Sequence, residues 1–186
     1  MKNVFVWIRP EGAKREDKFP ANLIKPELVK VMKADVEIDQ PCCNFIPHVV
    51  AAQAGQRIVI KNSAAFGHNA NWTSFNNGNF NKLIVPGGQF ALPNVLVFEP
   101  SEILLQCNLH GWMKAHVRIF DHPYFAITDA DGNFEIKDPP VGKFSLYVNH
   151  PATGWLNGAK GRMGKPIDIK AGATDVGTLE MKKAGD

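Results

Sequence analysis

The stretch Cys107-Asn108-Leu109-His110-Gly111-Trp112-Met113 carries more information about this chain than any other. It offers a thiol, an imidazole and a thioether on one short loop. Alternating or apolar segments lie on both sides of it, at 102–106 and 114–120, and each is typical of a β-strand. Soft sulfur ligands combined with imidazole favour copper over zinc, calcium or magnesium. The stretch therefore predicts a metal-binding loop that joins two strands.

A mononuclear site needs one more ligand, and His68 in Gly67-His68-Asn69 can supply it from a second loop, after the predicted strand 57–62. A trigonal set of two histidines and one cysteine with a weak axial methionine is a blue-copper electron-transfer site. Zinc is disfavoured because thioether is not a usual zinc ligand. We therefore predict one copper ion held by His68, Cys107 and His110, with Met113 as the axial ligand.

Short apolar segments separated by Gly, Pro and Asn clusters recur along the whole chain, and helical periodicity is nearly absent. Many short strands with turn signals between them indicate an all-β sandwich or barrel. Residues 25–32 could form one or two helical turns. Residues 74–94, rich in Asn and Gly, are expected to form a long surface loop with a short strand inside it.

The segments around the predicted ligands resemble those of cupredoxins. Residues 58–69 are similar to the segment before the first histidine ligand of plastocyanins, and the spacing Cys107-x-x-His110-x-x-Met113 is that of amicyanin. The resemblance covers about residues 35–120. It implies a Greek-key β-sandwich with a type 1 copper ion at one end, His68, Cys107 and His110 as equatorial ligands and Met113 as the axial one.

The resemblance also implies a role for the residue after the first histidine. In the family this residue is Asn, as Asn69 is here, and it helps to pin the cysteine loop. We therefore expect Asn69 to support the ligands through a hydrogen bond near Asn108. Gly111 and Ala115 depart from amicyanin-type loops, which carry Pro and often Gly at these positions.

The pattern of the sequence changes near residue 120. Residues 128–134 place Asp131-Gly132 between two alternating segments, which predicts a hairpin. The alternative, a calcium loop on Asp129 and Asp131, lacks the later ligands of such loops. The segment 117–150 resembles carboxypeptidase regulatory-like β-modules, which implies a packing or adhesion role without catalytic residues.

Two domains are therefore expected. Residues 1–120 would form the cupredoxin copper-binding domain, and residues 121–186 a smaller β-sandwich-like module packed on it. Sixty-odd residues are marginal for independent folding. The alternating segment Val4–Ile8 reads as a strand that the second module could borrow.

Further candidates surround the predicted copper site. Trp112 between two ligands and Trp72 after His68 would form a hydrophobic rim through which electrons leave, although core packing explains them as well. Cys42, Cys43 and His48 could form a second metal site or a redox-sensitive thiol pair. Buried, unreactive thiols are the alternative for the two cysteines.

Composition narrows the class of protein. The 186 residues are 45% hydrophobic and 21% charged, with a net charge of +3, which fits a globular protein and gives no reason to expect nucleic-acid binding. No apolar run approaches the roughly 18 residues of a membrane span. The given chain shows no signal peptide. Because copper chemistry favours an oxidising compartment, we expect a mature form in the periplasm or another extracytoplasmic space; the alternative is a protein that stays inside the cell.

The expected function is one-electron transfer to an unidentified redox partner protein through Cu(II)/Cu(I) cycling. One alternative is copper binding and delivery. Another is a protein- or glycan-binding β-module with structural copper. An enzyme is not expected, because the sequence offers no catalytic triad or phosphate loop.

Overall fold

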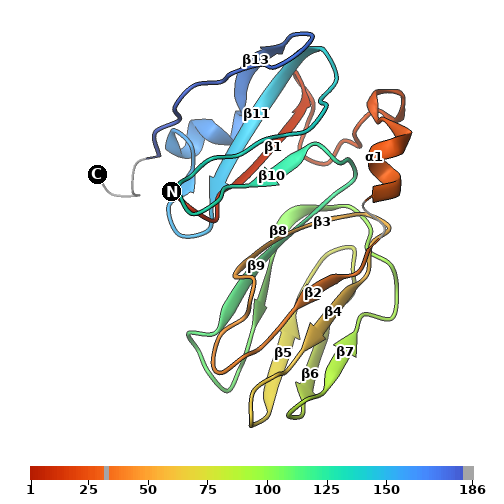
Figure 1. The fold of residues 1–186 in the computed structure, drawn as a ribbon, viewed down its shortest axis with the longest axis vertical. Coiled ribbons are helices and arrows are strands. Elements are labelled where there is room, and N and C mark those ends of the chain that lie inside the picture. The colour runs from red at the N-terminus through yellow and green to blue at the C-terminus, as the bar shows by residue number, and fades with distance from the viewer. Residues whose placement is uncertain (32–33, 182–186) are drawn as a thin grey trace. The chain divides into compact units, whose positions relative to one another are not determined.

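In a computed structural model, which describes residues 1–31 and 34–181, most of the regular secondary structure is short β-strand (Figure 1). The chain forms two compact units. The sandwich unit is Pro26–Pro123, and the composite unit combines Met1–Lys25 with the chain from Tyr124 onward. This division differs from the predicted 1–120 and 121–186, because the N-terminal strand pairs with strands that follow Tyr124.

Two sheets form the sandwich unit. The larger sheet has the strand order β3-β9-β8-β5-β6 and the smaller one the order β2-β4-β7. The chain crosses between the sheets twice here: β6 lies beside β5 in the larger sheet, β7 belongs to the smaller sheet, and β8 returns to the larger sheet beside β5. The bounds are β2 Val36–Ile38, β3 Val49–Gln53, β4 Ile58–Lys61, β5 His68–Trp72, β6 Phe80–Ile84, β7 Gln89–Ala91, β8 Glu99–Gln106 and β9 Lys114–Phe120.

One hydrophobic core fills the space between these sheets. It combines side chains from the small sheet, such as Ile58 and Ile60, with side chains from the large sheet, such as Ile103 and Val117. All four are buried. Two sheets that share one core in this way form a β-sandwich. The predicted all-β sandwich is therefore confirmed.

Strand β5 carries His68 and Trp72 on the same face. Successive side chains alternate across a strand, so His68, Ala70 and Trp72 all face the core, where each is fully buried. The Trp72 ring stacks on Phe80 with the ring centroids 5.7 Å apart. The assignment of Trp72 to the hydrophobic rim is therefore wrong and the alternative, core packing, holds, because the strand period that buries His68 also buries Trp72.

The predicted long loop 74–94 contains two strands instead of one. Strand β6 pairs with β5 and strand β7 pairs with β4, so this segment connects the two sheets. The turn before β6 is held by side chains: Asn77 accepts the Val97 amide at 2.8 Å, and Glu99 accepts the Asn76 amide at 2.9 Å. These distant partners could not be read from the local pattern of Asn and Gly.

The predicted helical turns at 25–32 correspond to α1, Pro26–Val31. Met32 lies outside the described residues. Short 3-10 turns occur at Ala21–Leu23 and Gly158–Met163. In the part of the chain that the structure describes, no helix is long and apolar enough to cross a membrane.

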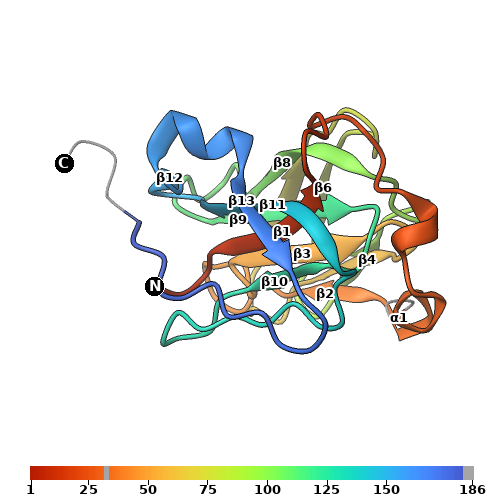
Figure 2. The ribbon, with the colours of Figure 1, turned by 90° about the horizontal axis from the view of Figure 1, so that it is seen from above.

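The composite unit contains one antiparallel sheet (Figure 2). Its strand order is β10-β1-β11-β12, and β13 also pairs with β11. The expectation that Val4–Ile8 joins the C-terminal segment is confirmed, and the Trp7 ring stacks on Tyr147 at 5.2 Å. The bounds are β1 Phe5–Pro10, β10 Phe125–Ile127, β11 Gly142–His150, β12 Gly154–Trp155 and β13 Lys165–Ile169.

A side-chain-stabilised turn follows β10. The Asp129 carboxylate accepts the backbone amides of Asp131 at 3.0 Å and Asn133 at 2.8 Å. These bonds, the one from Asn133 first, hold the Asp129 pKa below its ordinary value. The predicted turn is present and explains the aspartate without calcium, but the residues after it are not paired as a strand.

We predict that Trp72→Ala lowers the free energy of unfolding by about 3–5 kcal/mol, because it removes a fully buried aromatic side chain from the core. Urea unfolding of the metal-free protein measures the change. Trp112→Ala is the matched control: Trp112 is 68% exposed, and its loss should change stability by less than about 0.5 kcal/mol. Equal effects of the two substitutions would contradict the assignment of Trp72 to the core.

Candidate metal centre

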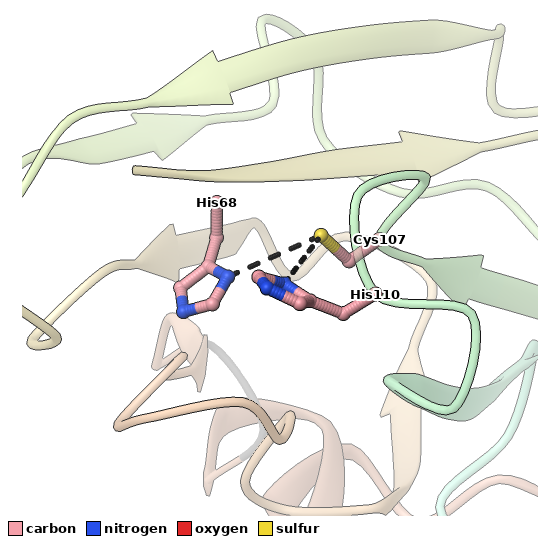
Figure 3. A group of neighbouring side chains, drawn as sticks. All are labelled: His68, Cys107 and His110. Carbon is pink, nitrogen blue, oxygen red and sulfur yellow. Dashed lines mark hydrogen bonds between the residues drawn. The ribbon is translucent and has the colours of Figure 1, made fainter. Parts of the chain in front are cut away.

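Three metal-binding side chains meet at one end of the sandwich (Figure 3). His68 begins β5, Cys107 directly follows β8, and His110 lies on the loop between β8 and β9. Strands β5 and β8 are antiparallel neighbours, so the beginning of β5 lies near the end of β8. This pairing brings residues that are 39 positions apart in the sequence into contact.

The three donor atoms are spaced as ligands of one ion. Cys107 Sγ lies 4.0 Å from His68 Nδ1 and 3.7 Å from His110 Nδ1. Sulfur and nitrogen ligands about 2.3 Å and about 2.0 Å from one metal ion lie roughly 3.5–4.0 Å apart at bond angles of roughly 110–135°. The donor set and its spacing therefore fit a single soft metal ion such as copper.

Burial differs between the two histidines. His68 is completely buried, whereas His110 is only partly buried. Burial, followed by the nearby charge of His110, lowers the pKa of His68 below its ordinary value. A metal ligand must be unprotonated, so the lowered pKa keeps the His68 ring in the form that binds metal over a wider pH range.

The ligand loop is closed by two backbone hydrogen bonds. The Cys107 amide donates to the Met113 carbonyl at 3.0 Å, and the Met113 amide donates to the His110 carbonyl at 2.8 Å. Met113 is fully buried and belongs to the same core cluster as Cys107. The loop therefore folds back on itself and holds the Met113 side chain inside the protein, at the level of the cysteine.

Asn69 joins the ligand loop to strand β5. Its side-chain oxygen accepts the backbone amides of Asn108 at 2.7 Å and Leu109 at 3.4 Å, and it also accepts the Cys107 thiol at 3.2 Å. The Asn108 side chain in turn accepts a bond from Asn71 at 3.0 Å. The structure thus brings Asn69 and Asn108, both predicted to support the ligands, into direct contact.

Aromatic rings surround the two imidazoles. The Trp112 ring lies 5.3 Å from His110, and the Phe66 ring lies 5.0 Å from His68 and 6.3 Å from His110. Sequence reasoning did not single out Phe66. Its position two residues before His68, at the end of a loop, was the available signal, but an aromatic residue there is equally typical of ordinary packing.

The second predicted cluster is not assembled as a trio. The Cys42 and Cys43 sulfurs lie 3.6 Å apart. The exposed His48 instead donates through Nδ1 to the Lys114 carbonyl at 2.8 Å, and its ring lies 5.2 Å from that of His116. Across residues 1–31 and 34–181, the three residues at the proposed copper site are the one group of three or more such ligands that lie together. The inclusion of His48 with the two cysteines was therefore wrong, because the strand pairing of β3 with β9 places it beside His116.

We predict that Asn69→Ala destabilises the protein by about 1–3 kcal/mol, because it leaves two part-buried loop amides and the buried Cys107 thiol without their acceptor. Asn71→Ala is the matched control on the same strand: it removes one exposed side-chain bond and should change stability by no more than about 0.5 kcal/mol. Denaturant unfolding of both variants measures the difference. The role of Asn69 as the anchor of the loop is contradicted if the two variants are equally stable.

Acid should lower the stability of the metal-free protein through the protonation of His68 in the unfolded chain. The unfolded chain takes up a proton at this residue near its ordinary pKa of 6.5, whereas the folded protein resists protonation until a lower pH. Because the unfolded state then binds more protons, the free energy of unfolding should fall as the pH drops below about 6.5. Unfolding curves between about pH 7.5 and 5.5 measure this slope. His68→Gln should flatten it, and an unchanged slope in that variant would rule out His68 as its source.

No family model and no curated protein matches the chain. Among solved structures, it is similar to a purple cupredoxin from Nitrosopumilus maritimus, with 20% identity over 46% of this chain and 99% of that one and a TM-score of 0.37. It is also similar to an amicyanin mutant in the oxidised state, with 12% identity over 46% of this chain and 81% of that one and a TM-score of 0.40.

A third similar structure is a copper-containing nitrite reductase from Thermus scotoductus SA-01. The identity is 18%, the TM-score is 0.41, and the match covers 46% of this chain but only 22% of the reductase. The solved structures to which this chain is similar therefore include cupredoxins.

Proposed function

We propose that this protein is a one-electron carrier with a single type 1 copper ion. His68, Cys107 and His110 would be the equatorial ligands and Met113 the weak axial one. The observation that carries the proposal is the convergence of one buried cysteine sulfur and two imidazole Nδ1 atoms on one point. Copper bound there supplies a Cu(II)/Cu(I) couple.

The protein's contribution to electron transfer is a ligand set that moves little. His68 belongs to a paired strand, and the Cys107 amide is bonded within the loop. The Asn69 side chain holds the same loop at three points. A site held by packing and by outer hydrogen bonds keeps its geometry when the charge at its centre changes, which favours rapid electron exchange.

The surface near His110 supports a docking role. Phe66, Leu83, Leu109 and Trp112 are all exposed hydrophobic residues, and we call them the apolar rim. Phe66 and Trp112 contact the imidazoles directly, and Leu83 lies against Gly67, next to His68. Exposed apolar groups gathered around one point mark interaction surfaces. We propose that a redox partner protein binds this rim and that electrons leave through His110 and Trp112.

The proposed chemistry also favours a cellular location. A copper–thiolate centre works best where copper is available and the surroundings are oxidising. We therefore propose that the protein acts in the periplasm or another extracytoplasmic space.

The proposal predicts an intense visible absorption band after Cu(II) is added to the purified protein, because a thiolate ligand transfers charge to the metal. Cys107→Ser should abolish the band by removing that ligand. Cys43→Ser, which removes another thiol, is the matched control and should leave the band in place. Voltammetry of the copper-loaded protein should give one reversible one-electron wave, which Cys107→Ser should also abolish.

A colourless protein, or a band that survives Cys107→Ser, would exclude the type 1 centre. A band without a reversible wave would separate copper binding from electron transfer and would favour copper delivery or a structural ion.

A further inference from the structure

Cys42 and Cys43 form a pair of neighbouring thiols that the copper centre does not use. Their sulfur atoms are 3.6 Å apart, and both cysteines are free. Cys42 is exposed and Cys43 is partly buried. The pair is therefore open to a ligand from solvent.

The backbone makes these two side chains converge. Consecutive side chains of an extended chain point to opposite sides. Here both residues have positive φ, 40° for Cys42 and 67° for Cys43. This left-handed conformation is uncommon for residues other than glycine and is a form of backbone strain that concentrates at binding sites. Its result is that two adjacent thiols lie on the same side of the turn.

The turn is fixed next to the segment that carries the first histidine ligand. Asp39 and Ile46 exchange two backbone hydrogen bonds of 2.8 Å, which close the turn. The Asp39 carboxylate accepts the Ser63 hydroxyl at 2.6 Å. Gln40 donates through its side chain to the Asn69 carbonyl at 3.2 Å. The dithiol is thus held in place by the strand and loop that position His68.

The protonation of Cys43 reflects the neighbouring thiol. The Cys43 pKa is raised, first by its hydrogen bond with Cys42, then by burial and by the charges of Cys42 and Cys107. The raised pKa means that the Cys43 thiol stays protonated to a higher pH than an ordinary thiol, so a metal ion that binds this sulfur must displace the proton.

A disulfide is a poor fit for this pair. Cα atoms joined by a disulfide are usually about 4.4–6.8 Å apart, whereas consecutive Cα atoms are about 3.8 Å apart. A metal ion is a better fit: two sulfurs about 2.3 Å from one ion can lie up to about 4.6 Å apart, so the observed spacing suits a bent pair of ligands. A pair of thiolates without imidazole selects soft metal ions. Of the two oxidation states of copper, such a pair therefore prefers Cu(I) to Cu(II).

We propose that Cys42 and Cys43 form a second, surface metal site that binds Cu(I) through both sulfurs. Each thiol releases one proton as its sulfur binds the ion, and the ion stays Cu(I), so the step needs no oxidant or reductant. The site is separate from the proposed copper centre. It does not include His48, whose Nδ1 is bonded to the Lys114 carbonyl.

The test is an anaerobic titration of the full chain with Cu(I) in competition with a coloured Cu(I) chelator. The wild type should bind one more Cu(I) than Cys42→Ser/Cys43→Ser. Cys107→Ser should keep the site, and His48→Ala, the matched control, should bind as the wild type does. Each single variant should weaken the site by about 100-fold or more, since the loss of even an outer partner of a ligand costs about 10–100-fold.

A trivalent arsenical, which bridges two neighbouring thiols, gives a second readout that does not depend on copper. Phenylarsine oxide should bind one equivalent to Cys107→Ser and none to the double serine variant. Equal Cu(I) stoichiometry in the wild type and in the double variant overturns the proposal, as does arsenical binding by the double variant. The two proposals can also fail separately. If Cys107→Ser binds Cu(I) and the arsenical but the wild type shows no visible band with Cu(II), the dithiol site is supported and only the electron-carrier function is rejected.

Discussion

The side-chain oxygen of Asn69 is the contact on which the geometry of the proposed centre depends. It accepts bonds from the amides of two residues in the ligand loop and from the Cys107 thiol. A further hydrogen bond from β5 to the loop is the exposed one from Asn71 to Asn108, and the two backbone closures lie within the loop itself. Since Asn69 directly follows His68, the same strand supplies one ligand and fixes the position of the others. Backbone pairing of β5 with β6 and β8 then extends this rigidity into the sheet.

Much of the centre could be predicted because its signals are local. A cysteine, a histidine and a methionine on one loop between two strands describe a chemistry regardless of the rest of the fold. The contact of Asn69 with Asn108 could be expected only through the resemblance to cupredoxins, because it joins residues 39 positions apart. Trp72 was assigned to the rim by its closeness to His68 in sequence. The alternation of β5 was sufficient to place it in the core.

Features that depend on distant pairing could not be derived in the same way. The segment Val4–Ile8 was expected to join the C-terminal module as a strand, and it does, but the predicted domain bounds still placed the whole N-terminal segment with the sandwich unit. His48 stands five residues after Cys43 and was grouped with it for that reason. In the structure the parallel pairing of β3 with β9 places it beside His116. Closeness in sequence is therefore a poor guide to closeness in space wherever a turn leads from one strand to the next.

The two proposed sites of the sandwich unit offer different sulfur environments, which would suit different oxidation states of copper. Cys107 is buried and stands between two imidazoles, and a mixed set of nitrogen and sulfur ligands accepts both Cu(II) and Cu(I). Cys42 and Cys43 offer sulfur alone at the surface, a set that holds the softer Cu(I). The turn that carries Cys42 and Cys43 is hydrogen-bonded through Gln40 to Asn69 on β5, the strand that carries His68. Both proposed sites are therefore attached to the same strand. Under the two proposals, Cu(I) at the surface and copper in the buried centre would be held by separate ligands.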